Sequence, residues 1–108
     1  MRILKNNVTL VGNMGSDARV TNFENGGKVV RFELAQDKSY RSNSGETKNK
    51  TEWHKVFAWG YYAQMIEQFG GKGKKVAIIG HLVNRTYVNR EGIVRNITEV
   101  EIREILRL

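Results

Sequence analysis

Glycine-rich turns divide this chain into short segments, and this division constrains the fold more than any other feature. The sequence contains eleven glycines and no proline. The glycines gather at residues 25–27, at Gly45, at residues 70–73 and at Gly92, and the segments between them have strand character. Because glycine adopts turn conformations most readily, this spacing predicts one compact β-rich domain over residues 1–108.

Composition and alternation predict the first strands. Residues 3–13 and the weaker segment 19–23 have the β-branched and apolar residues of strands. Apolar and charged residues alternate through residues 30–34, which indicates a strand with one buried face, and the same period returns over residues 51–59. The polar residues 39–50 between these two strands predict a long mobile hairpin loop.

A short helix and two further strands complete the pattern. Four apolar residues at i, i+3, i+4 and i+7 predict an amphipathic helix that stops at Gly70. They are Tyr62, Met65, Ile66 and Phe69. Residues 75–87 predict a strand in which Gly80 permits a bulge, and residues 93–106 predict the last strand, although the closing segment 99–108 also fits a helix at its end. This order is that of an OB-fold, an all-β five-stranded Greek-key barrel with one short helix that binds oligonucleotides or oligosaccharides.

The strand predicted at residues 51–59 has two very different faces. One face carries Trp53, Lys55, Phe57 and Trp59, and the other carries Glu52, His54, Val56 and Ala58. Aromatic rings interleaved with a cation suit single-stranded DNA, because bases stack on the rings and phosphates attract the cation. The alternative is that the rings fill the barrel. Burying Lys55 without a partner is costly, so the exposed, DNA-binding interpretation is favoured.

The charge of the chain favours a polyanionic partner. Lysine and arginine outnumber aspartate and glutamate 18 to 11, which gives a formal net charge of +7. No apolar run approaches the roughly 18 residues of a spanning helix, and the N-terminus does not resemble a secretion signal. We therefore expect a soluble, cytoplasmic, nucleoid-associated protein with no membrane partner. The absence of cysteine excludes disulfides and thiolate metal sites.

Several residues outside the tryptophan strand fit the same function less specifically. Tyr40 and Tyr87 lie among basic residues on predicted hairpins, where each fits either a base-stacking residue or an ordinary surface tyrosine. The basic residues that fit phosphate contacts, or simply solvated charges, are Arg31, Lys48, Lys50, Lys72, Lys74, Lys75, Arg85 and Arg95.

A metal-dependent enzyme is the alternative from a different class. Its ligands would be Glu52, His54 and His81, whose spacing does not match the three-ligand pattern of catalytic zinc. The sequence also contains no nucleophile elbow and no glycine-rich phosphate cradle. We therefore expect no catalytic residues, no metal, no cofactor and no enzymatic activity.

Five segments, in this order along the chain, resemble the bacterial single-stranded DNA-binding protein family. They are VTLVGNMGSD, NGGKVVRFELA, TEWHKVFAWG, KGKKVAIIGHL and RTY, and together they span almost the whole chain. The resemblance implies an OB-fold that binds, wraps and protects single-stranded DNA without sequence specificity during replication, recombination and repair. It also implies a homotetramer.

The resemblance further assigns roles to individual residues. The positions it implies for base stacking are Tyr40, Trp53, Trp59 and Tyr87. The positions it implies for phosphate contacts are Arg2, Lys55, Lys72 and Arg85. It associates His54 with the subunit interface, which agrees with the position of His54 on the face opposite the tryptophans.

The end of the sequence departs from the family pattern. Family members usually continue through a flexible linker to an acidic tip that recruits other proteins, whereas this sequence ends at residues 105–108 with a basic residue near its end. We therefore expect no acidic tail within residues 1–108, as in either a trimmed or a naturally short form of the protein, which puts tail-mediated partners in doubt. The remaining alternatives are a tail-less OB-fold paralogue that assists primosome assembly or recombination as a dimer, and an OB-fold domain for RNA or a saccharide.

Overall fold

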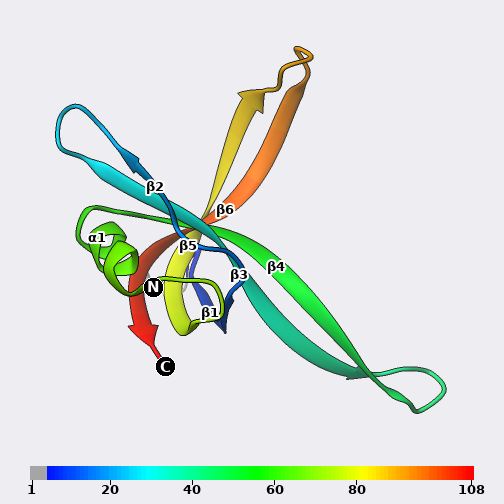
Figure 1. Cartoon of the computed structure of the whole chain (residues 1–108). Coiled ribbons are helices and arrows are strands. Elements are labelled where there is room, and N and C mark those ends of the chain that lie inside the picture. Colours follow the sequence, from blue (N-terminus) through cyan, green and yellow to red (C-terminus); the bar gives the residue numbers. More distant parts are fainter. Residues whose placement is uncertain (1–4) are drawn as a thin grey trace.

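Six strands and one helix follow the predicted order in the computed structural model, which describes residues 5–108 (Figure 1). The strands are β1 (Val8–Met14), β2 (Arg19–Asn22), β3 (Lys28–Arg41), β4 (Thr47–Trp59), β5 (Lys75–Val88) and β6 (Val94–Arg107), and helix α1 (Gly60–Phe69) lies between β4 and β5. Arg2, a predicted phosphate contact, lies outside the described residues.

Five of the strands close into a barrel. They are hydrogen-bonded in the order β1, β5, β6, β4, β3, and the ring closes because β1 also pairs with β3. The short strand β2 extends the sheet beyond β3. Strands β4 and β6 run parallel, and the other pairs are antiparallel. This closed arrangement with one helix between the strands confirms the predicted OB-fold.

The period-two alternation of the strands places the core inside the barrel. The largest fully buried side chains are Phe32, Met14, Leu34, Ile66, Ile78, Val30, Val56 and Val76. Helix α1 adds Ala63 and Ile66 to this core, while Tyr62, Met65 and Phe69 pack against it, as the predicted helical stripe requires. Within residues 5–108, no helix is long and apolar enough to cross a membrane.

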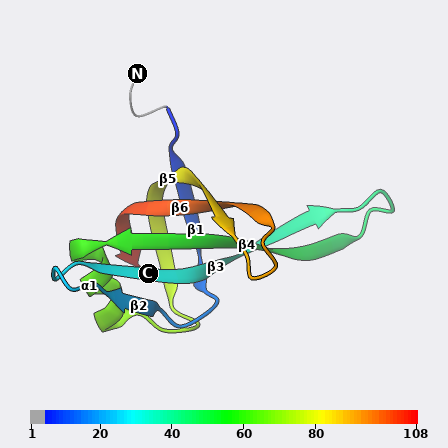
Figure 2. The same cartoon turned by 90° about the horizontal axis from the view of Figure 1, so that it is seen from above.

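Residues 39–50 form the predicted hairpin, but most of them are paired strand residues, so the prediction of a long loop is wrong. Strands β3 and β4 stay in register along this segment, and the chain turns only at residues 42–46. The resulting ribbon projects from the barrel in Figures 1 and 2. Its strand residues are exposed on both faces, and a side-chain hydrogen bond from Ser39 Oγ to Asn49 Oδ1 (2.9 Å) crosses it. A ribbon without a buried face needs no apolar alternation, which is why the pattern missed it.

The closing segment is a strand rather than a helix. Ile102 and Ile105 both point into the core, although their spacing is that of a helix face. The register of β5 and β6 shifts at Gly80, so that Arg103 has no partner and the alternation resumes one residue later. This shift confirms the predicted bulge at Gly80, where a Cβ atom would lie 2.1 Å from the carbonyl oxygen of Glu101.

Candidate nucleic-acid interface

The outer face of β4 presents both tryptophans of the chain to solvent. Trp53 is 61% exposed and Trp59 is 49% exposed, and Lys55 between them is also exposed. Lys55 takes part in no ion pair within residues 5–108. The alternative that these rings fill the barrel is therefore wrong for both tryptophans, and the charge of Lys55 is free to attract an anion.

Trp53 lies against small residues that leave room for its ring. A Cβ atom at Gly15 would lie 2.2 Å from Cζ3 of Trp53, and Ala35 is the residue that pairs with Trp53 across the sheet. The segment of Gly15 is fixed by its backbone N–H, which donates to the carbonyl oxygen of Glu33 at 2.7 Å. One side of the indole is thus supported by backbone while most of its surface stays open.

Trp59 is supported by a second aromatic residue that the sequence analysis missed. Phe23 stacks against it with ring centroids 5.8 Å apart and an interplanar angle of 23°. Phe23 follows β2 directly and begins the turn into β3, whose residue Val29 pairs with Trp59. The sequence did contain a signal for this role, because Phe23 stands immediately before the glycine-rich hairpin turn at residues 25–27.

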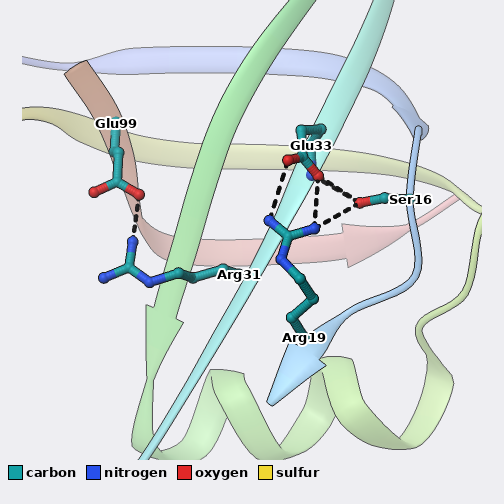
Figure 3. Close-up of polar contacts among 5 residues, drawn as sticks. All are labelled: Ser16, Arg19, Arg31, Glu33 and Glu99. Carbon is teal, nitrogen blue, oxygen red and sulfur yellow. Dashed lines mark hydrogen bonds and ion pairs between the residues drawn. The ribbon is translucent and has the colours of Figure 1, made fainter. Parts of the chain in front are cut away.

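Phe57 shares the outer face of β4 but differs from the tryptophans in being buried, with 6% exposure. The guanidinium carbon of Arg31, the residue paired with Phe57 on β3, lies 5.0 Å from the ring centroid. Arg31 continues across β4 and donates a hydrogen bond to the carboxylate of Glu99 on β6 (Figure 3). Phe57 is therefore covered by an arginine from the neighbouring strand.

Glu99 also holds a second arginine. Arg85 Nε donates to Glu99 Oε1 at 3.0 Å, and the guanidinium of Arg85 lies 6.0 Å from the ring centroid of Tyr87. The Glu99 side chain is only 5% exposed. One buried carboxylate thus orients two arginines beside two aromatic rings, an arrangement that the sequence pattern did not indicate.

The remaining predicted residues lie at separate edges of the molecule. Tyr40, 50% exposed, is on the β3–β4 ribbon, and Tyr87, 43% exposed, is near the tip of the β5–β6 hairpin (Figure 1). Lys72 is exposed in the turn between α1 and β5, where its backbone N–H donates to Asp17 Oδ1 at 2.8 Å. The structure therefore places Trp53, Lys55 and Trp59 on one strand face, whereas Tyr40 and Lys72 lie on other elements. Tyr87 is linked to that face through Arg85 and Glu99.

Glu33 is the residue that pairs with Lys55 across β3 and β4, and its carboxylate is also bonded. Arg19 donates two hydrogen bonds to it, from Nη1 at 2.9 Å and from Nη2 at 3.1 Å, and Ser16 Oγ donates a third at 2.6 Å (Figure 3). The bonds from Arg19 and then Ser16 hold the pKa of Glu33 below its ordinary value, with a smaller contribution from the positive charge of Lys55.

Replacing Glu33 with glutamine is expected to lower the melting temperature more at pH 7 than at pH 3. Because the pKa is lower in the folded chain than in the unfolded chain, ionised Glu33 stabilises the fold above the unfolded value of about 4.3. This stabilisation is lost as the pH falls through the folded pKa. Thermal unfolding of Glu33→Gln and the parent from pH 3 to pH 7 tests the prediction, with Glu46→Gln on the hairpin turn as the charge-matched control. A constant difference between Glu33→Gln and the parent across this range would contradict it.

His54 lies on the opposite side of β4 from the tryptophans, as predicted. It is half-buried, and its Nε2 lies 3.3 Å from Oε1 of Gln36. It lines a groove among β4, β5 and β6 that also includes Trp53, Lys55, Leu82 and Ile97. The role of His54 at a subunit interface stays a prediction.

The residues of the metal-enzyme alternative are not assembled into a site. His81 lies beside Glu101, with Nε2 3.5 Å from Oε1, and not beside His54 or Glu52. Among residues 5–108, no three histidine, aspartate or glutamate side chains are grouped as metal ligands.

Comparisons with known proteins agree with this architecture. Residues 5–108 match the Single-strand binding protein family. Among solved structures, Plasmodium falciparum SSB in complex with ssDNA is similar at a TM-score of 0.88 and 27% identity, covering 95% of this chain and 94% of that chain. A deletion mutant of the single-stranded DNA binding protein from Thermus aquaticus is similar at a TM-score of 0.83 and 21% identity, covering 95% of this chain and 50% of that chain. This chain thus spans about half of the Thermus protein, and that likeness shows the shared fold.

Proposed function

We propose, since the chain belongs to the single-strand binding protein family, that it binds single-stranded DNA along the outer face of β4 without strong sequence preference. The observation that carries this proposal is the alternation of exposed Trp53, Lys55 and Trp59 on one strand. Every base has a face that stacks on an aromatic ring, so such binding tolerates any sequence. The net charge of +7 adds attraction to the phosphates.

The proposed path of the DNA extends beyond β4 to the two hairpins. Tyr40 and Tyr87 are each about half exposed, on two hairpins that project from the barrel (Figure 1), so they would offer bases further stacking surfaces. Lys72 and Arg85 are the proposed phosphate contacts outside β4, although Arg85 is already paired with Glu99. A strand that follows these separate surfaces would wrap around the protein.

We propose that the chain acts as a homotetramer that protects single-stranded DNA during replication, recombination and repair, and not as an enzyme. It would do so as one domain, in association with the nucleoid. The side chain of Leu82, which is apolar and 46% exposed, supports a subunit contact beside His54, because both residues line one groove. Trp53 and Lys55 line the same groove, so a subunit seated there would lie next to the proposed DNA surface. Light scattering separates the tetramer from the dimer expected of an accessory paralogue.

Titration with oligo-dT at low salt tests the proposed function. Because both tryptophans of the chain lie on the proposed surface, their emission is expected to fall as bases stack on them. The logarithm of the binding constant is expected to fall linearly with the logarithm of the salt concentration, with a slope of about −0.7 per phosphate contact. Unchanged emission would contradict the proposal. Tighter binding to oligo-U or a glycan than to oligo-dT would favour the alternative ligands of an OB-fold.

A further inference from the structure

Between the two tryptophans, the outer face of β4 is occupied by a third aromatic residue with an arginine over it. Phe57 is two residues from Trp59 and four from Trp53 on the same strand. At a rise of about 3.3 Å per residue, Phe57 lies about 7 Å from Trp59 and about 13 Å from Trp53 along β4. A DNA strand that contacts both tryptophans must therefore pass over this position.

The surface that the DNA would meet there is the guanidinium of Arg31. The Phe57 ring is only 6% exposed, whereas the Arg31 side chain above it is 33% exposed. A guanidinium is planar and delocalised, so it stacks on an aromatic ring on one side and accepts another flat group on the other. Nucleobases stack on arginine planes as they do on aromatic rings.

Glu99 determines how Arg31 can act. Its two carboxylate oxygens are both used, one by Arg31 and the other by Arg85. The side chain is 5% exposed, and separating a buried carboxylate from its partners is strongly unfavourable. Arg31 is therefore held over Phe57, and the fixed position of its planar group suits stacking. Its positive charge is only partly compensated, because two arginines share one carboxylate, so the stacking and phosphate assignments must be separated by experiment.

Building on the proposed function, we propose that Arg31 is a base-stacking residue, whose guanidinium receives a nucleobase between the positions of Trp53 and Trp59. Glu99 is the positioning residue that holds Arg31 on Phe57. The opposing assignment is a phosphate contact, which needs the charge of Arg31 and not its planar shape.

Two substitutions of Arg31 separate the assignments. Arg31→Lys keeps the charge and removes the planar group, while Arg31→Ala removes both and leaves Glu99 paired with Arg85. If Arg31 stacks on a base, both variants are expected to bind oligo-dT about fivefold or more weakly, with the parent salt dependence. If Arg31 contacts phosphate, Arg31→Lys binds like the parent, and Arg31→Ala reduces the salt slope by about 0.7. Either of these last two results would overturn the inference.

Two further variants complete the experiment. Lys55→Ala is the control for a phosphate contact on the same face. Its salt dependence is expected to be weaker, with a slope that is less negative by about 0.7. Glu99→Gln should release Arg31 and Arg85 and so make the salt slope steeper, an effect that a merely structural role of Glu99 would not produce. A slope for Glu99→Gln equal to that of the parent would overturn the positioning role. Parent-like binding by both Arg31 variants refutes only the stacking assignment, whereas a parent protein that fails to bind oligo-dT refutes the proposed function itself.

Discussion

The Trp53→Ala variant is expected to bind oligo-dT about 5- to 150-fold more weakly than the parent while the domain stays folded. Stacking of one base on an aromatic ring contributes about 1–3 kcal/mol, and each 1.4 kcal/mol is about a tenfold change in affinity. Because Trp53 is 61% exposed, its ring adds little to the core, and the melting temperature should change little. Fluorescence anisotropy of labelled oligo-dT measures the affinity, and circular dichroism measures the unfolding.

Two further variants test whether the position of the Trp53 ring determines the affinity for oligo-dT. Gly15→Ala keeps every aromatic residue but places a Cβ atom 2.2 Å from the present position of the Trp53 ring, so the ring must move and binding should weaken. Leu108→Ala removes a side chain of similar exposure, 65%, at the last residue of the sequence, outside β4, and should bind like the parent. If Trp53→Ala unfolds the domain, Trp53 is a core residue and the stacking role is wrong.

The parts of the fold that sequence predicted are those governed by local periodicity. The alternation around Phe32 identified the buried face of β3, because side chains of a strand point alternately to its two faces. The β3–β4 ribbon was missed because both of its faces are in solvent, so its polar sequence carries no alternation. The end of β6 was ambiguous because the bulge opposite Gly80 gives Ile102 and Ile105 the spacing of a helix.

The parts of the candidate site that depend on β4 alone could be predicted from the sequence, whereas the parts that depend on contacts between strands could not. Lys55 indicated that its face of β4 is exposed, and the structure shows both tryptophans of that face in solvent. The burial of Phe57 depends on Arg31 of β3 and Glu99 of β6. The pairing of β4 with these two strands brings the three residues together. Such contacts join residues far apart in the chain, and no spacing within one segment encodes them.

The Phe32→Ala variant is expected to have the opposite effect to Trp53→Ala, with a large loss of stability and nearly unchanged affinity. Phe32 is 1% exposed and belongs to the hydrophobic core, and truncation of a buried phenylalanine to alanine costs about 3–5 kcal/mol. That loss is a large part of the roughly 5–15 kcal/mol by which domains are stable. Urea unfolding at equal protein concentrations measures the free energy of unfolding, and anisotropy measures oligo-dT affinity where the variant is still folded.

Phe32→Leu is the companion variant in case Phe32→Ala does not fold, and it should show a smaller loss of stability with parent affinity. The separation of the two effects follows from the geometry of β3, where Phe32 points into the barrel while its neighbours Arg31 and Glu33 lie on the outer face. If folded Phe32→Leu or Phe32→Ala bound oligo-dT as weakly as Trp53→Ala does, the two faces would not act independently. The interface would then depend on core packing to set the positions of its outer side chains.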